Sequence, residues 1–484
     1  MKTQTKNTAA SLLAQGVSVL CGLILPRQIL LHYGSEMNGL AHSVSQFLQF
    51  AVVMELGLGA VIPAAFYKPL AEKNYGQISA ILTSAYRTFR KMAAILAAYI
   101  GVLVLLFPRI TNSAFPWEAS AAMLICVGLG AVVGYLAGKP ENLLLISDQK
   151  GYVSYTVSIV TTVLSTAVSV ALIRMDCSLA TIKLAASLIS IGSIVVICQY
   201  VTYHYPVTHR AQYTGEPIPQ KWNGIAQHIA YIVLEYTDII VLTLFMTFRE
   251  VSVYSVYLMV ITGIKRFFTS ATYSIQPKLG ELWAKGERDA LERFFSKFER
   301  GVHLCAVLLF TCTGLLIVPF VRVYTDGVTD TQYIQPLFAS LLTLAYGVQC
   351  LRDPYDKLIL ASGHFRQTQH NYIIAACLNI VLSVLAVGRW GLPGVAAGTL
   401  AAMVYQTAYM AYYDSKVLLK RPLRKSALQL LIDAATTGVI LLVAGRIHLD
   451  VHNMATWFLQ ALAVFAVAAA ITGAVAFLRF RKHQ

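Results

Sequence analysis

Two stretches of the sequence, Leu70–Lys91 (LAEKNYGQISAILTSAYRTFRK) and Leu279–Arg300 (LGELWAKGERDALERFFSKFER), share one plan. Each starts at the end of an apolar segment, passes a lysine and a glycine-containing break, and continues as a helix with aromatic and basic residues. They lie about 210 residues apart, and self-similarity at a fixed separation indicates that a larger unit is repeated.

Two further pairs of segments support this repeat. Glu141–Tyr155 (ENLLLISDQKGYVSY) resembles Asp356–His370 (DKLILASGHFRQTQH), and Tyr33–Leu40 (YGSEMNGL) more weakly resembles Thr247–Tyr254 (TFREVSVY). Six helices are therefore expected to repeat as six in the same orientation. Transporters are often built from such repeats, with the substrate site at the interface between them.

Composition places the chain in the membrane. Of its 484 residues, 57% are hydrophobic and only 13% are charged, whereas soluble proteins carry about 25% charged residues. This excludes a soluble globular protein and a disordered chain, and it leaves no room for a large extramembrane catalytic domain. The sequence has no nucleotide-binding P-loop, zinc-protease or nucleophile-elbow motif, and its eight cysteines show no metal-ligand spacing. We therefore expect neither an enzyme nor a resident metal or cofactor.

Fourteen apolar segments are long enough to cross a bilayer, for which about 20 residues suffice. They are 9–32, 37–66, 92–108, 119–138, 152–173, 180–203, 223–247, 251–277, 301–321, 332–361, 368–388, 392–413, 426–446 and 455–478. The predicted fold is all-α: a polytopic membrane protein with 14 transmembrane helices in two six-helix lobes plus two C-terminal helices. The predicted N-lobe is 1–203, the cytoplasmic linker 204–222, the C-lobe 223–418, and the last two helices with the tail 419–484.

The distribution of positive charge predicts the orientation. The net charge is +15, and cytoplasmic loops of membrane proteins are rich in lysine and arginine. With both termini inside, the outer loops hold only a few basic residues: Arg109, Arg174, Arg249, Arg322, Arg389 and Arg446. Because the excess positive charge belongs to loops and tails, it does not indicate a nucleic-acid partner.

Charged residues inside spans are costly and mark functional sites. Arg27 follows Pro26, which can kink a helix, and Lys265 and Arg266 lie in the middle of the eighth span. None of these three has an acid one helical turn away. Because the guanidinium fork matches phosphate oxygens, they are candidates for a diphosphate or other anion site, and Arg352 in the tenth span joins them. The alternative is a set of interhelical ion pairs with Glu55, Glu235 or Asp238.

The intramembrane acids are candidates for ion coupling or charge pairing. Glu235 and Asp238 are three residues apart and share a helix face, so they could bind Na⁺ or H⁺ or instead form salt bridges. Arg352–Asp356 and Asp353–Lys357 are spaced for mutual neutralisation within one helix. Lys183 and Asp433 lie near span ends, where we expect their side chains to snorkel to the membrane surface.

Aromatic residues suggest two further roles. Tyr254, Tyr257 and Tyr273 could stack on sugars, or they could simply pack between helices. The apolar faces of the two repeated segments, 78–89 and 291–298, suit helices lying on an anionic inner leaflet. Cytoplasmic extensions of the spans that follow would give the same pattern.

Several segments resemble the polysaccharide transporters of the multidrug/oligosaccharidyl-lipid/polysaccharide flippase superfamily. They are Lys6–Leu40 (KNTAASLLAQGVSVLCGLILPRQILLHYGSEMNGL), Met54–Asn74 (MELGLGAVIPAAFYKPLAEKN), Glu235–Phe245 (EYTDIIVLTLF), Val251–Ile261 (VSVYSVYLMVI) and Asp353–Phe365 (DPYDKLILASGHF). The resemblance covers nearly the whole chain, including the fourteen-helix, two-lobe plan.

This resemblance implies a flippase that moves undecaprenyl-diphosphate-linked oligosaccharide from the inner to the outer leaflet of the bacterial plasma membrane by alternating access. It also implies membrane lipids and polysaccharide polymerase or export machinery as partners. Related lipid II flippases use arginines on helices 1, 2 and 8. Arg27 and Lys265/Arg266 fit that pattern, whereas helix 2 departs from it because it carries Glu55.

Two other functions remain open. A cation-coupled multidrug exporter of the same superfamily would prefer an acidic, aromatic cavity, which the basic residues disfavour. A scaffold subunit of a membrane complex would not need charges buried within its spans.

Overall fold

The computed structural model is helical throughout the part of the chain that it describes, which comprises residues 2–50, 53, 55, 58–111, 115–212, 215, 218, 225–273, 275–447 and 450–481. The chain divides into two compact units. Unit 1 comprises Met1–Ile232 and Thr247–Ser252, and unit 2 comprises Val233–Met246 and Val253–Gln484. The lobe and linker boundaries given above remain predictions.

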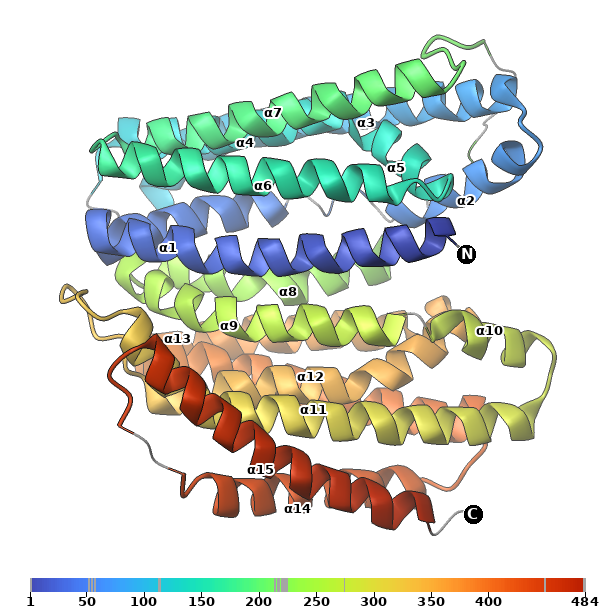
Figure 1. Cartoon of the computed structure of the whole chain (residues 1–484), viewed down its shortest axis with the longest axis vertical. Coiled ribbons are helices and arrows are strands. Elements are labelled where there is room, and N and C mark those ends of the chain that lie inside the picture. The colour runs from blue at the N-terminus through green and yellow to red at the C-terminus, as the bar shows by residue number, and fades with distance from the viewer. Residues whose placement is uncertain are drawn as a thin grey trace. The chain divides into compact units, whose positions relative to one another are not determined.

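The first seven helices belong to unit 1. They are α1 (Lys2–Phe50), α2 (Leu58–Ala71), α3 (Tyr75–Ile110), α4 (Trp117–Leu136), α5 (Lys139–Ser147), α6 (Gly151–Arg174) and α7 (Leu179–His204). Within the unit, α6 lies between α1 and α7 (Figure 1). The start of α1 is held beside the α5–α6 turn, because Asn7 donates to the carbonyl of Gln149 at 2.6 Å and accepts from the backbone of Tyr152 at 2.8 Å.

The remaining helices lie wholly or mainly in unit 2. They are α8 (Ile225–Phe245), α9 (Phe248–Tyr273), α10 (Gln276–Ala284), α11 (Arg288–Tyr324), α12 (Pro336–Ser362), α13 (Phe365–Tyr413), the π-helical turn η2 (Asp414–Leu418), α14 (Arg424–Ala444) and α15 (Met454–Arg481). The last two helices pack on α11 and on each other (Figure 1). A small apolar core that includes Leu316, Ile440 and Val464 joins these three helices.

The predicted all-α, membrane-spanning fold is confirmed, and the fourteen predicted spans compare with fifteen α-helices in the described part. Ten helices of that part are long and apolar enough to cross a membrane. Two of them are longer than a single span: α1 contains the predicted span 9–32 and part of 37–66, and α13 contains 368–388 and 392–413. These long helices bend at Gly34 and Gly391, whose positive φ angles leave the helical region. Pro26, the expected kink, lies inside continuous helix instead.

The two repeated amphipathic segments are extensions of the spans that follow them, not separate helices on the membrane surface. Residues 78–89 are continuous with the rest of α3, and residues 291–298 with the rest of α11. Their apolar faces are covered by protein: Ile78, Leu82 and Phe295 are completely buried. The sequence pattern is the same in both cases, because a lipid surface and a protein surface select the same apolar stripe.

Candidate functional site

Glu235 of α8 is the centre of a polar cluster in unit 2. Its Oε1 lies 2.5 Å from the Nζ of Lys265 on α9 and accepts from the amide of Gln349 on α12 at 2.6 Å. The Lys265 ammonium also lies 5.2 Å from the centre of the Tyr346 ring. Both charged side chains are more than four-fifths shielded from solvent, so removing either one would leave the other buried without its partner. Lys265, a predicted anion-binding residue, is thus paired with an acid.

Asp238, one helical turn from Glu235, has a different environment. Its carboxylate accepts from the Tyr254 hydroxyl at 2.7 Å, the Thr399 hydroxyl at 2.7 Å and the Asn379 amide at 3.2 Å. All three donors are neutral, and the residue is only 5% exposed. A carboxylate held in this way can exchange a proton or a small cation without separating an ion pair. The two acids predicted to couple ions thus differ in their partners: Glu235 is paired with a lysine, and Asp238 has only neutral hydrogen-bond donors.

The spacing of the charges on α12 predicts two ion pairs within this helix, and the structure contains one of them, Asp353–Lys357. Lys357 lies 3.5 Å from Asp353 and 3.9 Å from Asp356, and Asp356 also accepts from the hydroxyl of Tyr372. The prediction that Arg352 pairs with Asp356 is wrong. Arg352 donates instead to the side-chain oxygen of Gln406 on α13. A residue on a neighbouring helix displaces the same-helix partner because α12 and α13 pack along their length.

The charge of Glu55 in unit 1 is neutralised by Lys139, which lies much later in the chain, at the start of α5. Its Oε1 lies 2.6 Å from the Nζ of Lys139 and accepts from the Tyr135 hydroxyl at 2.5 Å. The Lys139 ammonium lies 5.2 Å from the centre of the Tyr135 ring. Glu55 therefore does not pair with Arg27, and its charge is already compensated within unit 1.

Two predicted cations have no acidic partner in the part of the chain that the structure describes. Arg27 on α1 is half-buried and Arg266 on α9 is exposed. Neither forms an ion pair with any residue of the described ranges. They belong to different units, Arg27 to unit 1 and Arg266 to unit 2. Lys265 and Arg266, although adjacent, thus differ: Lys265 forms an ion pair, and Arg266 has an exposed side chain.

The predicted sugar-stacking tyrosines are enclosed by protein. Tyr254 and Tyr257 are 1% and 0% exposed, and their ring centres lie 5.5 and 5.2 Å from that of Phe338. Tyr257 donates to the carbonyl of Tyr333 at 2.9 Å. This environment is what the packing alternative requires, and neither ring presents a face to solvent. The side chain of Tyr273 lies outside the described residues.

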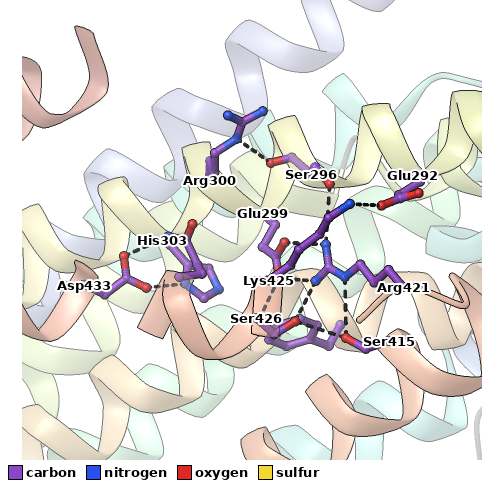
Figure 2. A network of polar contacts seen from close by, with 12 residues as sticks. Glu292, Ser296, Glu299, Arg300, His303, Ser415, Arg421, Lys425, Ser426 and Asp433 are labelled. Atoms are coloured by element: carbon purple, nitrogen blue, oxygen red, sulfur yellow. Dashed lines mark hydrogen bonds and ion pairs between the residues drawn. The ribbon is translucent and has the colours of Figure 1, made fainter. Parts of the chain in front are cut away.

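A buried ion-pair cluster in unit 2 has no counterpart in the predictions (Figure 2). Arg421, in the segment before α14, forms two hydrogen bonds to Glu299 of α11, at 2.8 and 2.6 Å. Tyr355 of α12 donates to the same carboxylate at 2.8 Å. Burial opposes the charge on Arg421, but the bonds to Glu299 outweigh it and raise the pKa of the guanidinium. This cluster fastens the segment before α14 to α11.

A second buried pair joins α11 to α14, four residues further along α11 than Glu299 (Figure 2). His303 of α11 contacts Asp433 of α14 at 2.6 Å, and Gln429 donates to that carboxylate at 2.8 Å. Asp433 is 3% exposed, so the prediction that it snorkels to the membrane surface is wrong. The reason is that a polar partner on α11 satisfies it within the protein. Neither pair could be found from spacing, because each joins residues more than a hundred positions apart.

Unit 1 has a related cluster around Glu141 of α5. This completely buried carboxylate accepts from the Tyr86 hydroxyl, from the backbone of Gly138 at 3.1 Å, and contacts the ring of His209 at 3.3 Å. Tyr86 belongs to the first repeated segment and Glu299 to the second. In both units a tyrosine–glutamate hydrogen bond thus joins the repeated segment to a neighbouring helix, with the two residue types exchanged.

Comparison with known proteins gives structural relatives only. No family profile and no curated protein sequence matches the chain. A solved structure of the lipid II flippase MurJ in an inward closed conformation superposes with a TM-score of 0.70 at 12% identity, covering 98% of this chain and 99% of that one. The chain has the fold of these transporters.

Multidrug transporters share the same architecture. An inward-facing MATE family transporter of the MOP superfamily gives a TM-score of 0.63 at 13% identity, over 85% of this chain and 95% of that one. The eukaryotic MATE transporter AtDTX14 gives 0.60 at 12% identity, over 96% and 98%. At these identities the likeness shows the fold alone, and both a lipid II flippase and multidrug transporters have this fold.

Proposed function

We propose that the chain is a flippase that moves undecaprenyl-diphosphate-linked oligosaccharide from the inner to the outer leaflet of the bacterial plasma membrane. The observation that carries this proposal is the pairing state of the cations. Both expected arginines on α1 and α9, Arg27 and Arg266, lack an acidic partner among the described residues, whereas Lys265 is paired with Glu235. An arginine left without a carboxylate within its unit is suited to an anionic ligand.

The diphosphate is the part of this substrate that the arginines would bind. Guanidinium groups form paired, charge-assisted hydrogen bonds with phosphate oxygens. In an alternating-access cycle, Arg27 and Arg266 would each engage the diphosphate, with Arg352 as a further donor. The likeness to a lipid II flippase along the entire chain supports a lipid-linked substrate.

Ion coupling is assigned to Asp238. Its neutral hydrogen-bond donors make it an acid that could take up and release H⁺ or Na⁺ without breaking a salt bridge. Glu235 holds Lys265 and contributes to the shape of the site. We further propose polysaccharide polymerase or export machinery as functional partners, and cytoplasmic N- and C-termini.

Single charge reversals test the diphosphate site. Arg27→Glu and Arg266→Glu should each abolish surface-glycan export in cells that depend on this chain, with normal amounts of folded protein in the membrane. The control is Arg293→Glu, an exposed arginine on the extramembrane half of α11, which should export normally. Normal export by both Arg27→Glu and Arg266→Glu would reject the site.

The second candidate function is cation-coupled multidrug export. It is favoured by the MATE structures and by the buried carboxylate of Asp238. Cells that express the chain would then tolerate higher concentrations of lipophilic cations, and Asp238→Asn would remove this tolerance. Under the flippase proposal, drug tolerance does not change while glycan export depends on the chain.

A further inference from the structure

Unit 1 contains a basic pocket that the proposed transport cycle does not use. The pocket has a volume of about 880 Å³ and lies between the first half of α3 and the segment 205–212 that follows α7. Among the described residues, its wall includes four positively charged side chains and no acidic one: Arg87, Arg90, Lys91 and Arg210. The rings of Tyr86 and His209 complete it.

Hydrogen bonds fix the two walls of this pocket to each other. The backbone N–H of Thr208 donates to the Ser79 hydroxyl, and that of Ala211 to the Thr83 hydroxyl, each at 3.1 Å. The His209 ring packs edge-on against Tyr86, with the ring centres 5.0 Å apart. Arg210 is therefore held opposite α3 by the ordered backbone on both sides of it.

The buried acid Glu141 forms no ion pair with the arginines or the lysine of the described pocket wall. Glu141 is completely buried beneath Tyr86 and His209, and its hydrogen bonds to Tyr86, His209 and Gly138 occupy it. The guanidinium of Arg90 lies 5.6 Å from the centre of the Tyr86 ring. Arg90 and Arg210 are both exposed, so their charges can reach a ligand.

The position of the pocket relative to the bilayer indicates the kind of ligand. Lys91 directly precedes the apolar stretch 92–108, and the predicted topology places this end of α3 on the cytoplasmic side. Arginines at such a boundary lie at the level of lipid headgroups, where basic side chains attract anionic lipids. A volume of this size accommodates a whole headgroup rather than a single phosphate ion.

We propose that this pocket binds the phosphate of a membrane-lipid headgroup at the inner surface. Arg90 from α3 and Arg210 from the 205–212 segment grip the phosphate from two sides, and Arg87 and Lys91 add to the positive potential. The shared chemistry fits both an anionic phospholipid and a polyprenyl diphosphate. The proposal does not depend on which substrate the transporter carries.

The test measures lipid binding to the purified full-length chain in a neutral detergent. Dioleoyl phosphatidylglycerol, a polyprenyl diphosphate, inorganic pyrophosphate and dioleoyl phosphatidylcholine are titrated separately, and binding is followed by native mass spectrometry and by the shift in Tm. We expect saturable binding of at least one of the two anionic lipids, which identifies the lipid, with weakening at high salt.

Charge-matched variants locate the binding. Arg90→Gln/Arg210→Gln should reduce the affinity about tenfold or more, since charge-assisted bonds to phosphate are lost. Arg293→Gln/Lys297→Gln removes the same charge from exposed positions of the matching segment on α11 and should bind as the wild type does. The single variant Arg210→Gln, on the linker, should show an intermediate loss.

Three results would overturn the proposal. The first is equal loss of affinity in both double variants, which would mean non-specific attraction. The second is unchanged affinity in Arg90→Gln/Arg210→Gln. The third is binding of inorganic pyrophosphate as tight as that of both lipids, which would remove the lipid from the assignment. Because these measurements need no transport, they succeed or fail independently of the proposed flippase activity.

Discussion

Most acids within the membrane region are compensated inside their own unit, and the compensation takes two forms. Glu235 and Glu55 have lysine partners, Lys265 and Lys139, whereas Asp238 has only neutral donors. A buried charge that loses its partner is strongly destabilising, since nothing else repays its desolvation. The pairing state of each residue therefore decides what a substitution there does.

Lys265→Met should destabilise unit 2 strongly, by roughly 3–5 kcal/mol, because it leaves the Glu235 carboxylate buried with Gln349 as its remaining neighbour. Lys265→Met/Glu235→Gln removes both charges and should recover most of that loss. The measurement is a double-mutant cycle of thermal or denaturant unfolding in detergent. Additive effects of the two single substitutions would contradict the ion pair.

His364, between α12 and α13, predicts a pH dependence. Burial, with a contribution from the charge of Arg288, lowers the pKa of its ring below 6.5, and its Nδ1 lies 2.8 Å from the Tyr413 hydroxyl. The folded chain thus binds this proton more weakly than the unfolded chain. The stabilising contribution is complete above pH 6.5 and is lost as the pH falls below it.

The check is the Tm of the wild type and of His364→Gln between pH 8 and pH 5. The wild type should lose more stability on acidification than His364→Gln does. Identical pH profiles of the two proteins would show that this histidine does not contribute.

Residue spacing could predict only some of the ion pairs within each unit. The sequence shows Asp353 and Lys357 on one face of one helix, and the structure pairs them at 3.5 Å. It could not show that Arg421 binds Glu299 or that Lys139 binds Glu55, because those contacts depend on how distant helices pack. Arg421 stands in a basic loop segment, so its buried position has no local signal in the sequence.

At the level of helices, small residues allow two stretches of backbone to approach each other closely. The two halves of α13 meet on either side of the bend at Gly391, and a Cβ on Gly398 would lie 2.5 Å from the Ser383 hydroxyl and 2.8 Å from its backbone nitrogen. Gly394, four residues earlier, makes a similar approach, because a Cβ there would lie 2.6 Å from the carbonyl oxygen of Ala386.

Gly398→Ala should therefore destabilise the protein by about 1–3 kcal/mol, the usual cost of overpacking. Gly388→Ala on the same helix is the matched control, since a Cβ there meets nothing within 4 Å. The control should be neutral or slightly stabilising because alanine favours helix over glycine. Unfolding measured in detergent compares them, and equal stability of the two variants would contradict the close packing of α13.

The attachment of α14 to α11 makes a second prediction at this scale. Arg421→Gln breaks a pair whose side chains are 1% and 5% exposed, and should cost roughly 3–5 kcal/mol. Lys425→Gln breaks the exposed pair with Glu292 nearby and should cost under about 1 kcal/mol. Limited proteolysis between α13 and α14 should cleave the Arg421 variant faster. Equal cleavage of both variants would show that the pair does not hold this segment.

For the whole molecule, long apolar segments were sufficient to predict an all-α, membrane-spanning fold. Fourteen apolar segments correspond to helices of an all-α structure, because the hydrocarbon thickness imposes a minimum length on every span. The amphipathic halves of α3 and α11 were ambiguous for a physical reason: the sequence records that a face is apolar and does not record what covers it. Substrate choice is likewise absent from the fold, which flippases and drug exporters share.

The most direct test of the central claim is translocation by the purified chain in proteoliposomes. Vesicles with a fluorescent polyprenyl-diphosphate-linked oligosaccharide, and separate vesicles with a fluorescent lipophilic cation, are compared with and without a proton or sodium gradient. The account predicts that the lipid-linked oligosaccharide crosses the bilayer in wild-type vesicles and not in Arg27→Glu or Arg266→Glu vesicles. Gradient-driven movement of the organic cation, with no movement of the lipid-linked oligosaccharide, would contradict it.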